Sequence, residues 1–357
     1  MKIGIIGLPK SGKTSIFNAL TGQDASTSGF NAKKAEPNVA SVDVKDKRVD
    51  VLVQMYRPKK ITCARFDVMD FVGMERKEGQ VFSPSELSLI KASDTLCIVL
   101  RNFEDDIIDG MCGKSNPISE LNEVFSELVL TDLIIVENRL ERIRHGFKRG
   151  VKTSTLVKEE DILCRISKAL ESGRPVSSVD TSIEEKKILS VFQFLTSKPI
   201  MVILNSGEDT FGNNADVLSK IGKNFRAIEF AGKFEIELSS LGEEDAAMFM
   251  EEMGINGSAL NRLAMLAYDV LGYISFFTVG PDEVRAWTIK KGDIALDAAG
   301  AIHSDIARGF IRAECFSYDD LIGLGSEKAI KKNGLFRLEG KNYRVKDGDI
   351  LGIRFSV

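Results

Sequence analysis

The chain has 357 residues, 43% of them hydrophobic, and its 48 basic and 52 acidic residues give a net charge of −4. This length exceeds a single typical core, so we expect two or three globular domains. The charge balance excludes a uniformly basic nucleic-acid-binding protein. Any RNA contact must therefore come from a local patch, and no DNA partner is expected.

The apolar stretches and the cysteines of the sequence indicate the compartment of the protein. The sequence has no stretch of eighteen uncharged apolar residues, and its N-terminus runs directly into a strand-like segment, so neither a membrane span nor a signal peptide is expected. We expect a cytoplasmic protein. The five cysteines are odd in number and show no C-x-x-C spacing, which favours reduced thiols over a zinc or disulfide framework.

The first motif lies at residues 7–14, which read G-L-P-K-S-G-K-T and match the phosphate-binding pattern GxxxxGK[ST]. A β-branched run at 2–6 precedes it and a helical pattern at 15–20 follows it, so backbone N–H groups and a helix dipole point at one anion. The alternative is a glycine-rich turn that carries Lys-Thr by chance. We predict that the chain binds a nucleoside triphosphate through Gly7, Lys10, Ser11, Gly12, Lys13, Thr14 and Ser15.

The residue types explain the chemistry of this loop. Gly7 and Gly12 let the backbone approach the β-phosphate, and Lys13 supplies a charge to the β- and γ-phosphates. The hydroxyl of Thr14 is expected to bind Mg²⁺. A strand-like segment at 61–69 leads into D-x-x-G, where Asp70 would reach Mg²⁺ through water and the N–H of Gly73 would meet the γ-phosphate.

A buried strand is predicted at 95–100, and apolar residues then recur at helical spacing over 121–144. A second helical run, 158–170, can return antiparallel to the first. The connection between them has no acidic residue inside 142–152 and is basic. We predict that it contacts ribosomal RNA, the alternative being a solvated charged loop, and the candidate residues are Arg142, Arg144, Lys148, Arg149 and Lys152.

The strand predicted at 199–204 ends in N-S-G-E at residues 205–208, where a guanine-specific GTPase has N-K-x-D. Glu208 is one methylene longer than Asp, and Ser206 cannot cover the base as Lys does. We therefore expect weakened guanine selectivity and binding of ATP or GTP, with Asn205, Ser206 and Glu208 near the base. The alternative is a plain turn after a strand.

The C-terminal part, 273–357, shows short β-type runs at 274–279, 310–316, 343–345 and 351–357 and one helical stretch at 326–332. This pattern predicts a small sheet with a helix across it.

Three groups of motifs resemble the YchF family of Obg-related P-loop proteins. They are N-x-x-E at 205–208, E-P-N at 36–38, and the runs F-F-T-V-G-P at 276–281 and G-F-I-R-A-E at 309–314. The resemblance implies an α/β fold with a Ras-like P-loop G-domain at 1–115 and 196–272, an inserted α-helical hairpin at 116–195 and a β-grasp TGS domain at 273–357. It also implies a cytosolic, ribosome-associated nucleoside triphosphatase that prefers or accepts ATP.

Departures from the family concern hydrolysis. Lys10 stands where the family usually has Asn, a position that helps hold K⁺ in related GTPases, and its ammonium would replace that ion. Lys34 falls where relatives have a Mg²⁺-binding Thr, Met74 where other GTPases position water, and Gly110 where some relatives carry His. No catalytic residue is assigned, and we expect slow turnover.

Two functions remain open at this point. The first is a slow ATPase or GTPase that acts as a translation-linked switch. The second is a hydrolysis-deficient nucleotide-binding module that docks on the ribosome or on a protein. A small-molecule kinase lacks an identifiable acceptor site.

Overall fold

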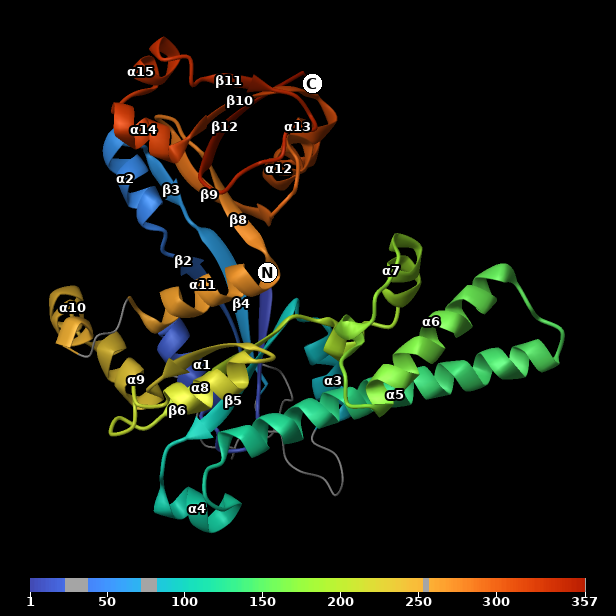
Figure 1. Cartoon of the computed structure of the whole chain (residues 1–357). Coiled ribbons are helices and arrows are strands. Elements are labelled where there is room, and N and C mark those ends of the chain that lie inside the picture. Colours follow the sequence, from blue (N-terminus) through green and yellow to red (C-terminus); the bar gives the residue numbers. More distant parts are fainter. Residues whose placement is uncertain (23–37, 72–81, 253–256, 357) are drawn as a thin grey trace. The chain divides into compact units, whose positions relative to one another are not determined.

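A computed structural model describes the structure of residues 1–22, 38–71, 82–252 and 257–356 (Figure 1). Contacts within the chain group it into two compact units. The first unit comprises Met1–Ser41 and Asp67–Leu266, and the second comprises Val42–Phe66 and Ala267–Val357. Among the helices in these described ranges, none is both long and apolar enough to cross a bilayer.

The first unit is built on a sheet with the strand order β2-β4-β1-β5-β6-β7. Its strands are β1 (Lys2–Ile6), β2 (Asn38–Val44), β4 (Ala64–Asp70), β5 (Thr95–Asn102), β6 (Ile200–Ser206) and β7 (Arg226–Phe230). From β4 to β7 all neighbouring strands pair in parallel. Parallel strands are usually covered on both faces, so their sequences are continuous apolar runs. The buried strand predicted at 95–100 from such a run is confirmed as β5.

Helices connect these strands, and several of them pack on the sheet. They are α1 (Lys13–Thr21), α3 (Pro84–Lys91), α4 (Asp106–Cys112), α5 (Pro117–Lys148), α8 (Ala215–Gly222), α9 (Gly232–Ser240), α10 (Glu243–Glu252) and α11 (Ala259–Leu271). One core forms where Ile98 and Leu204 of the central strands pack with Leu121 and Leu128 of α5. The carboxyl ends of parallel strands meet at one edge of the sheet, so the last residues of β1, β4 and β6 lie at that edge.

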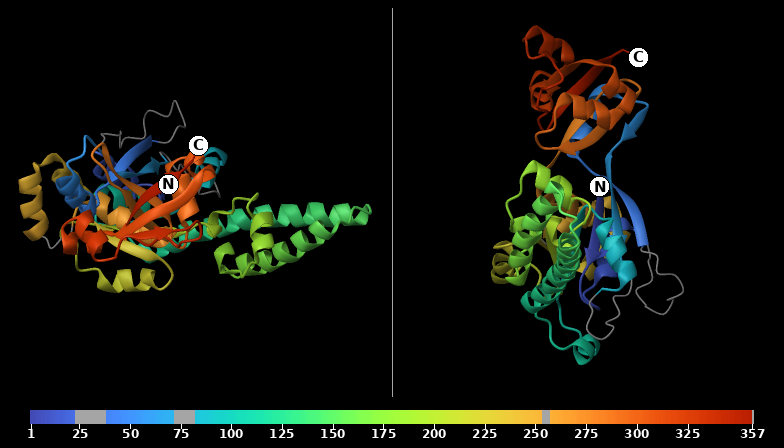
Figure 2. Two further views of the ribbon diagram at one scale, coloured as in Figure 1. Left: turned by 90° about the horizontal axis from the view of Figure 1, so that it is seen from above. Right: turned by 90° about the vertical axis from the view of Figure 1, so that its right-hand side faces the viewer.

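The predicted helical hairpin is present and longer than expected. Helix α5 runs to Lys148 and α6 (Ser154–Glu171) returns beside it, as Figure 2 shows. Pro117 at the first turn of α5 and Thr153 capping α6 fix the helix starts. Apolar residues of both helices form a separate core, and the chain then continues through η1 (Val176–Ser178), α7 (Ile183–Leu189) and η2 (Leu195–Ser197).

A buried carboxylate joins α5 to the segment that follows the hairpin. Asp132 Oδ1 accepts a hydrogen bond of 2.9 Å from the Leu195 N–H, and Oδ2 accepts bonds from the Thr196 N–H (2.8 Å) and hydroxyl (2.7 Å). Burial raises the pKa of Asp132, and these three donors oppose that rise. The carboxylate thus satisfies the first backbone donors of η2 in the way an N-cap does.

The second unit combines two distant parts of the sequence. Its mixed sheet has the order β11-β10-β12-β8-β9-β3, in which β3 (Lys60–Thr62) pairs in parallel with β9 (Glu283–Lys290). The other strands are β8 (Tyr273–Thr278), β10 (Phe310–Ser317), β11 (Arg337–Glu339) and β12 (Asp349–Phe355). The helices are α2 (Lys47–Tyr56), α12 (Ala295–Ile302), α13 (Ser304–Arg308), α14 (Tyr318–Leu324) and α15 (Glu327–Lys332).

Residues 42–66, which the resemblance placed in the G-domain, therefore pack with the C-terminal part of the chain. Val49 and Leu52 of α2 share a core with Phe277 and Val284. The strand predicted at 343–345 is wrong: only Arg344 forms a bridge there, with Ile294. The predicted helix at 326–332 is confirmed as α15.

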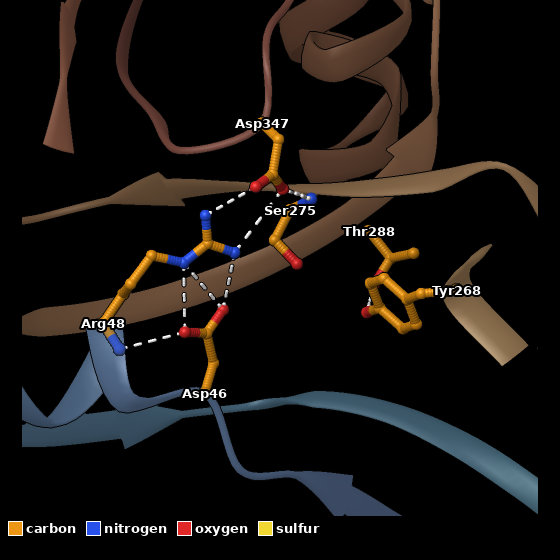
Figure 3. A network of polar contacts seen from close by, with 6 residues as sticks. All are labelled: Asp46, Arg48, Tyr268, Ser275, Thr288 and Asp347. Atoms are coloured by element: carbon orange, nitrogen blue, oxygen red, sulfur yellow. Dashed lines mark hydrogen bonds and ion pairs between the residues drawn. The ribbon is translucent and has the colours of Figure 1, made fainter. Parts of the chain in front are cut away.

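One arginine ties the two parts of the second unit together (Figure 3). Arg48 pairs with Asp46, the N-cap of α2, and its Nη1 lies 2.7 Å from Asp347 Oδ2. Asp347 Oδ1 in turn accepts a 2.8 Å hydrogen bond from the N–H of Ser275 on β8, and the guanidinium lies over the Phe277 ring. Arg48 therefore contacts two carboxylates and the face of an aromatic ring at the same time.

The carboxylate of Asp132 yields a stability prediction. Asp132→Asn replaces an acceptor oxygen with an NH₂ group, which leaves at least one buried donor near η2 unpaired, at a cost of about 2–3 kcal/mol. The free energy of local opening should fall by the same amount, so we expect the amide hydrogens of Leu195 and Thr196 to exchange faster with solvent. Asp161→Asn on the exposed side of α6 is the control and should change no exchange rate there. Equal protection in both variants would contradict the assigned role.

Candidate functional site

The loop between β1 and α1 has a backbone that only glycine permits at two points. Gly12, the N-cap of α1, has a φ of 93°, and a Cβ there would collide with the side-chain amide of Asn205. A Cβ on Gly7 would collide with the carbonyl oxygen of Val99 on β5. The loop thus lies against β5 and β6, and it leads directly into the N-terminus of α1, where backbone N–H groups and the helix dipole favour an anion.

Lys13 is buried beneath this loop. Its ammonium donates hydrogen bonds to the carbonyl oxygens of Gly7 (3.2 Å) and Leu8 (2.9 Å). Burial lowers the pKa of Lys13 to about 8, against the opposing charges of Asp70 and Glu86. The positive charge is therefore held at the loop by backbone oxygens and two nearby carboxylates.

Thr14 and Asp70 lie in direct contact, as the two motifs require. The Thr14 hydroxyl donates a 2.9 Å hydrogen bond to Asp70 Oδ2 at the end of β4. Asp70 is fully buried, which raises its pKa, whereas the side chains of Thr14, Lys13 and Asn38 lower it. Its Oδ1 has no hydrogen-bond partner of good geometry within the described ranges. The hydroxyl of Ser11 is likewise buried and without a partner in the described ranges. These polar atoms are placed to receive a ligand, since buried groups of this kind are normally paired.

Asn205 braces the phosphate loop from β6. Its Nδ2 donates to the Ser11 carbonyl oxygen (3.0 Å), and its Oδ1 accepts from the N–H of Gly232 (3.0 Å) at the start of α9. Both ends of this amide are thus engaged by the protein. The residue fixes three segments of the sheet edge with respect to one another.

Ser206 and Glu208 differ from each other in their surroundings. The hydroxyl of buried Ser206 donates to Glu229 Oε1 (2.5 Å) and accepts from Asn102 Nδ2 (2.9 Å). Glu208 lies two residues beyond the end of β6, in an exposed turn. The structure therefore brings Asn205 to the phosphate loop, places Ser206 in a neighbouring network and leaves the carboxylate of Glu208 open to a ligand.

The remaining predicted residues are placed as follows. Ser15 is partly buried in the first turn of α1, and Lys10 is exposed in the loop with a φ of 63°. Gly73, Lys34 and Met74 lie outside the described residues. All five basic candidates at the hairpin are exposed, with Arg142, Arg144 and Lys148 on α5 itself and Arg149 and Lys152 in the turn after it.

Sequence reasoning missed Glu86, a buried carboxylate of this site. Glu86 lies in the first turn of α3, where its Oε2 accepts from the Ser83 N–H (2.6 Å) in a capping box, and its Oε1 is buried without a partner in the described part of the chain. The signal was present, because S-P-S-E at 83–86 has the capping-box spacing. No local sequence pattern shows that this carboxylate lies near Lys13, because the two residues are far apart in the sequence.

Gly12 gives a test of the site geometry. Gly12→Ala must adopt a strained φ and displace Asn205, so we expect an affinity for nucleoside triphosphate about 100-fold weaker, by calorimetric titration. The control is Gly22→Ala, which also replaces a glycine of positive φ (64°) but in open space at the end of α1. It should lower stability by about 1 kcal/mol and leave nucleotide affinity unchanged. Equal affinities in the two variants would show that Asn205 does not brace the loop.

Comparisons with known proteins agree with a phosphate-binding site of this kind. A family described as 50S ribosome-binding GTPase matches residues 2–139, and the C-terminal YchF GTPase family, described as a protein of unknown function, matches residues 273–356. The chain is 39% identical to the ribosome-binding ATPase YchF of Bacillus subtilis, over 99% of each chain. It is 35% identical to Obg-like ATPase 1 of Caenorhabditis elegans, over 100% of this chain and 92% of the relative.

A solved structure gives the same result. The YchF GTPase of Schizosaccharomyces pombe superposes with a TM-score of 0.86 at 30% identity and covers 99% of this chain and 97% of its own. The predicted fold class and family resemblance are confirmed. The chain belongs to the YchF family of P-loop nucleotide-binding proteins.

Proposed function

We propose that this chain is a slow, ribosome-binding nucleoside triphosphatase of the cytoplasm that accepts ATP as well as GTP. The observation that carries the proposal is the buried Lys13, held under a glycine-dependent loop beside the Thr14–Asp70 pair. This arrangement supplies a charge for phosphate oxygens and oxygen donors for a cation in one place. Relatives of full length carry the name ribosome-binding ATPase.

Mg²⁺ is the cation that this donor set fits. Magnesium prefers hard oxygen ligands and keeps several waters, so a hydroxyl and one carboxylate suffice on the protein side. Thr14 and Asp70 would hold it, and the unpartnered Oδ1 of Asp70 supports that assignment. When bound, the ion neutralises charge on the β- and γ-phosphates.

The chain's own residues favour nucleotide binding over rapid hydrolysis. Lys13 binds phosphate oxygens, and Asn205 keeps the loop rigid, so both act on the ground state as well as on the transition state. Gly110, at the place where some relatives carry His, lies exposed on α4 and has no side chain to orient water. Hydrolysis therefore rests on charge neutralisation and positioning, with little acid-base assistance.

Base selectivity follows from the end of β6. Reading guanine requires a rigid carboxylate that accepts two hydrogen bonds, whereas Glu208 sits in an exposed turn. Ser206 is bound to Glu229 and Asn102 and does not cover a base. A rigid, buried reading group rejects the wrong base because that base leaves polar groups unpaired. The exposed Glu208 imposes no such penalty, so we expect weak discrimination between ATP and GTP.

The test is a parallel titration of nucleotide-free protein with Mg²⁺-ATP and Mg²⁺-GTP, followed by single-turnover hydrolysis with and without ribosomes. We expect ATP to bind at least as tightly as GTP, Lys13→Ala to bind neither, and ribosomes to accelerate hydrolysis. A strong preference for GTP would show that Glu208 still reads guanine. Bound but intact ATP under both conditions would replace the triphosphatase with a docking module.

Ribosome contact is proposed at the end of the α5–α6 hairpin. Arg142, Lys148 and Arg149 are exposed there and form no ion pair within the described ranges, whereas Arg144 lies 3.6 Å from Glu160. The ammonium of Lys152 lies 5.4 Å from the centre of the ring of Phe147, on the last turn of α5. Unpaired cations that alternate with an aromatic ring suit the phosphates and bases of RNA.

The hairpin is tested by charge reversal. We expect Arg142→Glu, Lys148→Glu and Arg149→Glu together to weaken co-sedimentation with ribosomes at low salt by at least about ten-fold, because three phosphate contacts are lost. The control reverses three exposed lysines elsewhere in the first unit, Lys186, Lys187 and Lys220. Unchanged sedimentation of the hairpin variant, or an equal loss in the control, would remove the hairpin from the binding surface.

A further inference from the structure

Helix α4 is held in place without a core of its own. It follows β5 at the edge of the sheet that carries the nucleotide site, and Figure 1 shows it standing away from the sheet. None of its seven residues, all of them described, is buried. A short helix of this kind is not stabilised by packing, so other interactions must define its position.

A buried arginine supplies the main interaction. Arg101 near the end of β5 is only 3% exposed, and its Nη1 lies 2.9 Å from Asp109 Oδ1 on α4. Its Nη2 donates to the carbonyl oxygen of Gly113, directly after the helix. Glu120 of α5 accepts a 3.0 Å bond from the Arg101 N–H and lies 3.7 Å from its Nε.

The anchor is completed at both ends of the helix. Asp105 accepts hydrogen bonds from the N–H groups of Ile107 and Ile108 (3.1 Å each), and the Ser115 hydroxyl donates to the Arg101 carbonyl oxygen (2.6 Å). Burying a guanidinium is costly unless its partners are well placed. A buried cation therefore fixes the position of an exposed helix. We infer that the fold specifies the orientation of α4.

The helix presents a pair of large apolar side chains. Ile107 is 73% exposed and Met111 is 72% exposed. They lie four residues apart and so share one face of the helix on successive turns. Glu104 and Asp106 are exposed at the start of the helix and Lys114 is exposed just after it, so the charge around the apolar pair is acidic on balance.

We propose that α4 docks on a protein component of the ribosome, with Ile107 and Met111 inserted into an apolar groove that basic side chains border. The charge decides the class of partner, since the carboxylates at 104 and 106 repel RNA phosphates and attract the basic surface of a ribosomal protein. The apolar pair supplies the central anchors and the carboxylates the polar rim. This inference rests on the proposed ribosome binding and adds a protein contact to the RNA contact of the hairpin.

The test uses the full chain and salt-washed ribosomes of Bacillus subtilis, the source of the 39% identical relative. Ile107→Ser with Met111→Ser should weaken ribosome binding by at least about ten-fold, while nucleotide binding stays unchanged. The matched control is Ile183→Ser with Val191→Ser, two apolar residues that are each 77% exposed elsewhere in the first unit. The control should bind as the wild type does.

A photo-crosslinking amino acid at position 111 then identifies the contact. The expected product is a crosslink to a ribosomal protein, and a crosslink to ribosomal RNA alone would overturn the proposal. If the wild type sediments with ribosomes and the Ile107→Ser/Met111→Ser variant does so equally, the α4 contact is refuted and the proposed function stands. If the wild type itself fails to sediment, ribosome binding and the α4 contact fall together.

Discussion

The burial of one ammonium group organises the nucleotide site. Lys13 has left bulk water, and its hydrogen bonds go to carbonyl oxygens of its own loop, which are accessible because glycines shape that loop. The carboxylates of Asp70 and Glu86 lie near enough to favour its charged form. An incoming phosphate therefore exchanges one set of oxygen acceptors for another, and the loop needs little reorganisation.

The sheet makes this arrangement possible by bringing distant segments to one edge. Asn205 at the end of β6 donates to the loop after β1 and accepts from the start of α9, so a single amide aligns three connections. Asn102 on β5 extends the same edge through Ser206 to Glu229. Arg101, the preceding residue, points to α4 instead. Two adjacent residues of β5 thus serve different parts of the first unit, Asn102 the end of β6 and Arg101 the proposed docking helix.

Local signals in the sequence were sufficient for the phosphate loop and the two long helices, because each rests on spacing within a short window. The single strand predicted at 61–69 is only partly right, since the chain forms β3 (Lys60–Thr62) in the sheet of the second unit and then β4 (Ala64–Asp70), which leads to the D-x-x-G motif in the sheet of the first. Contacts between distant residues were not predictable. The pairing of β3 with β9 and the Arg48–Asp347 ion pair join segments that lack any shared pattern. Helix α12 was missed because its alanines and Gly300 show weak polarity contrast. Asn205 was assigned to the site, but its use by the protein backbone emerged only from the structure.

The divided second unit has a consequence for how the protein is made. Val42–Phe66 leaves the ribosome early, whereas Ala267–Val357 is made only after the long intervening segment of the first unit. The apolar face of α2 therefore lacks its partners on β8 and β9 until the segment from Ala267 onward has been made, and closing so long a loop carries an entropic cost. A nascent chain of this design is exposed to aggregation through that face during most of its synthesis. For the same reason, a fragment that begins at Ala267 lacks β3 and α2 and cannot complete its own sheet.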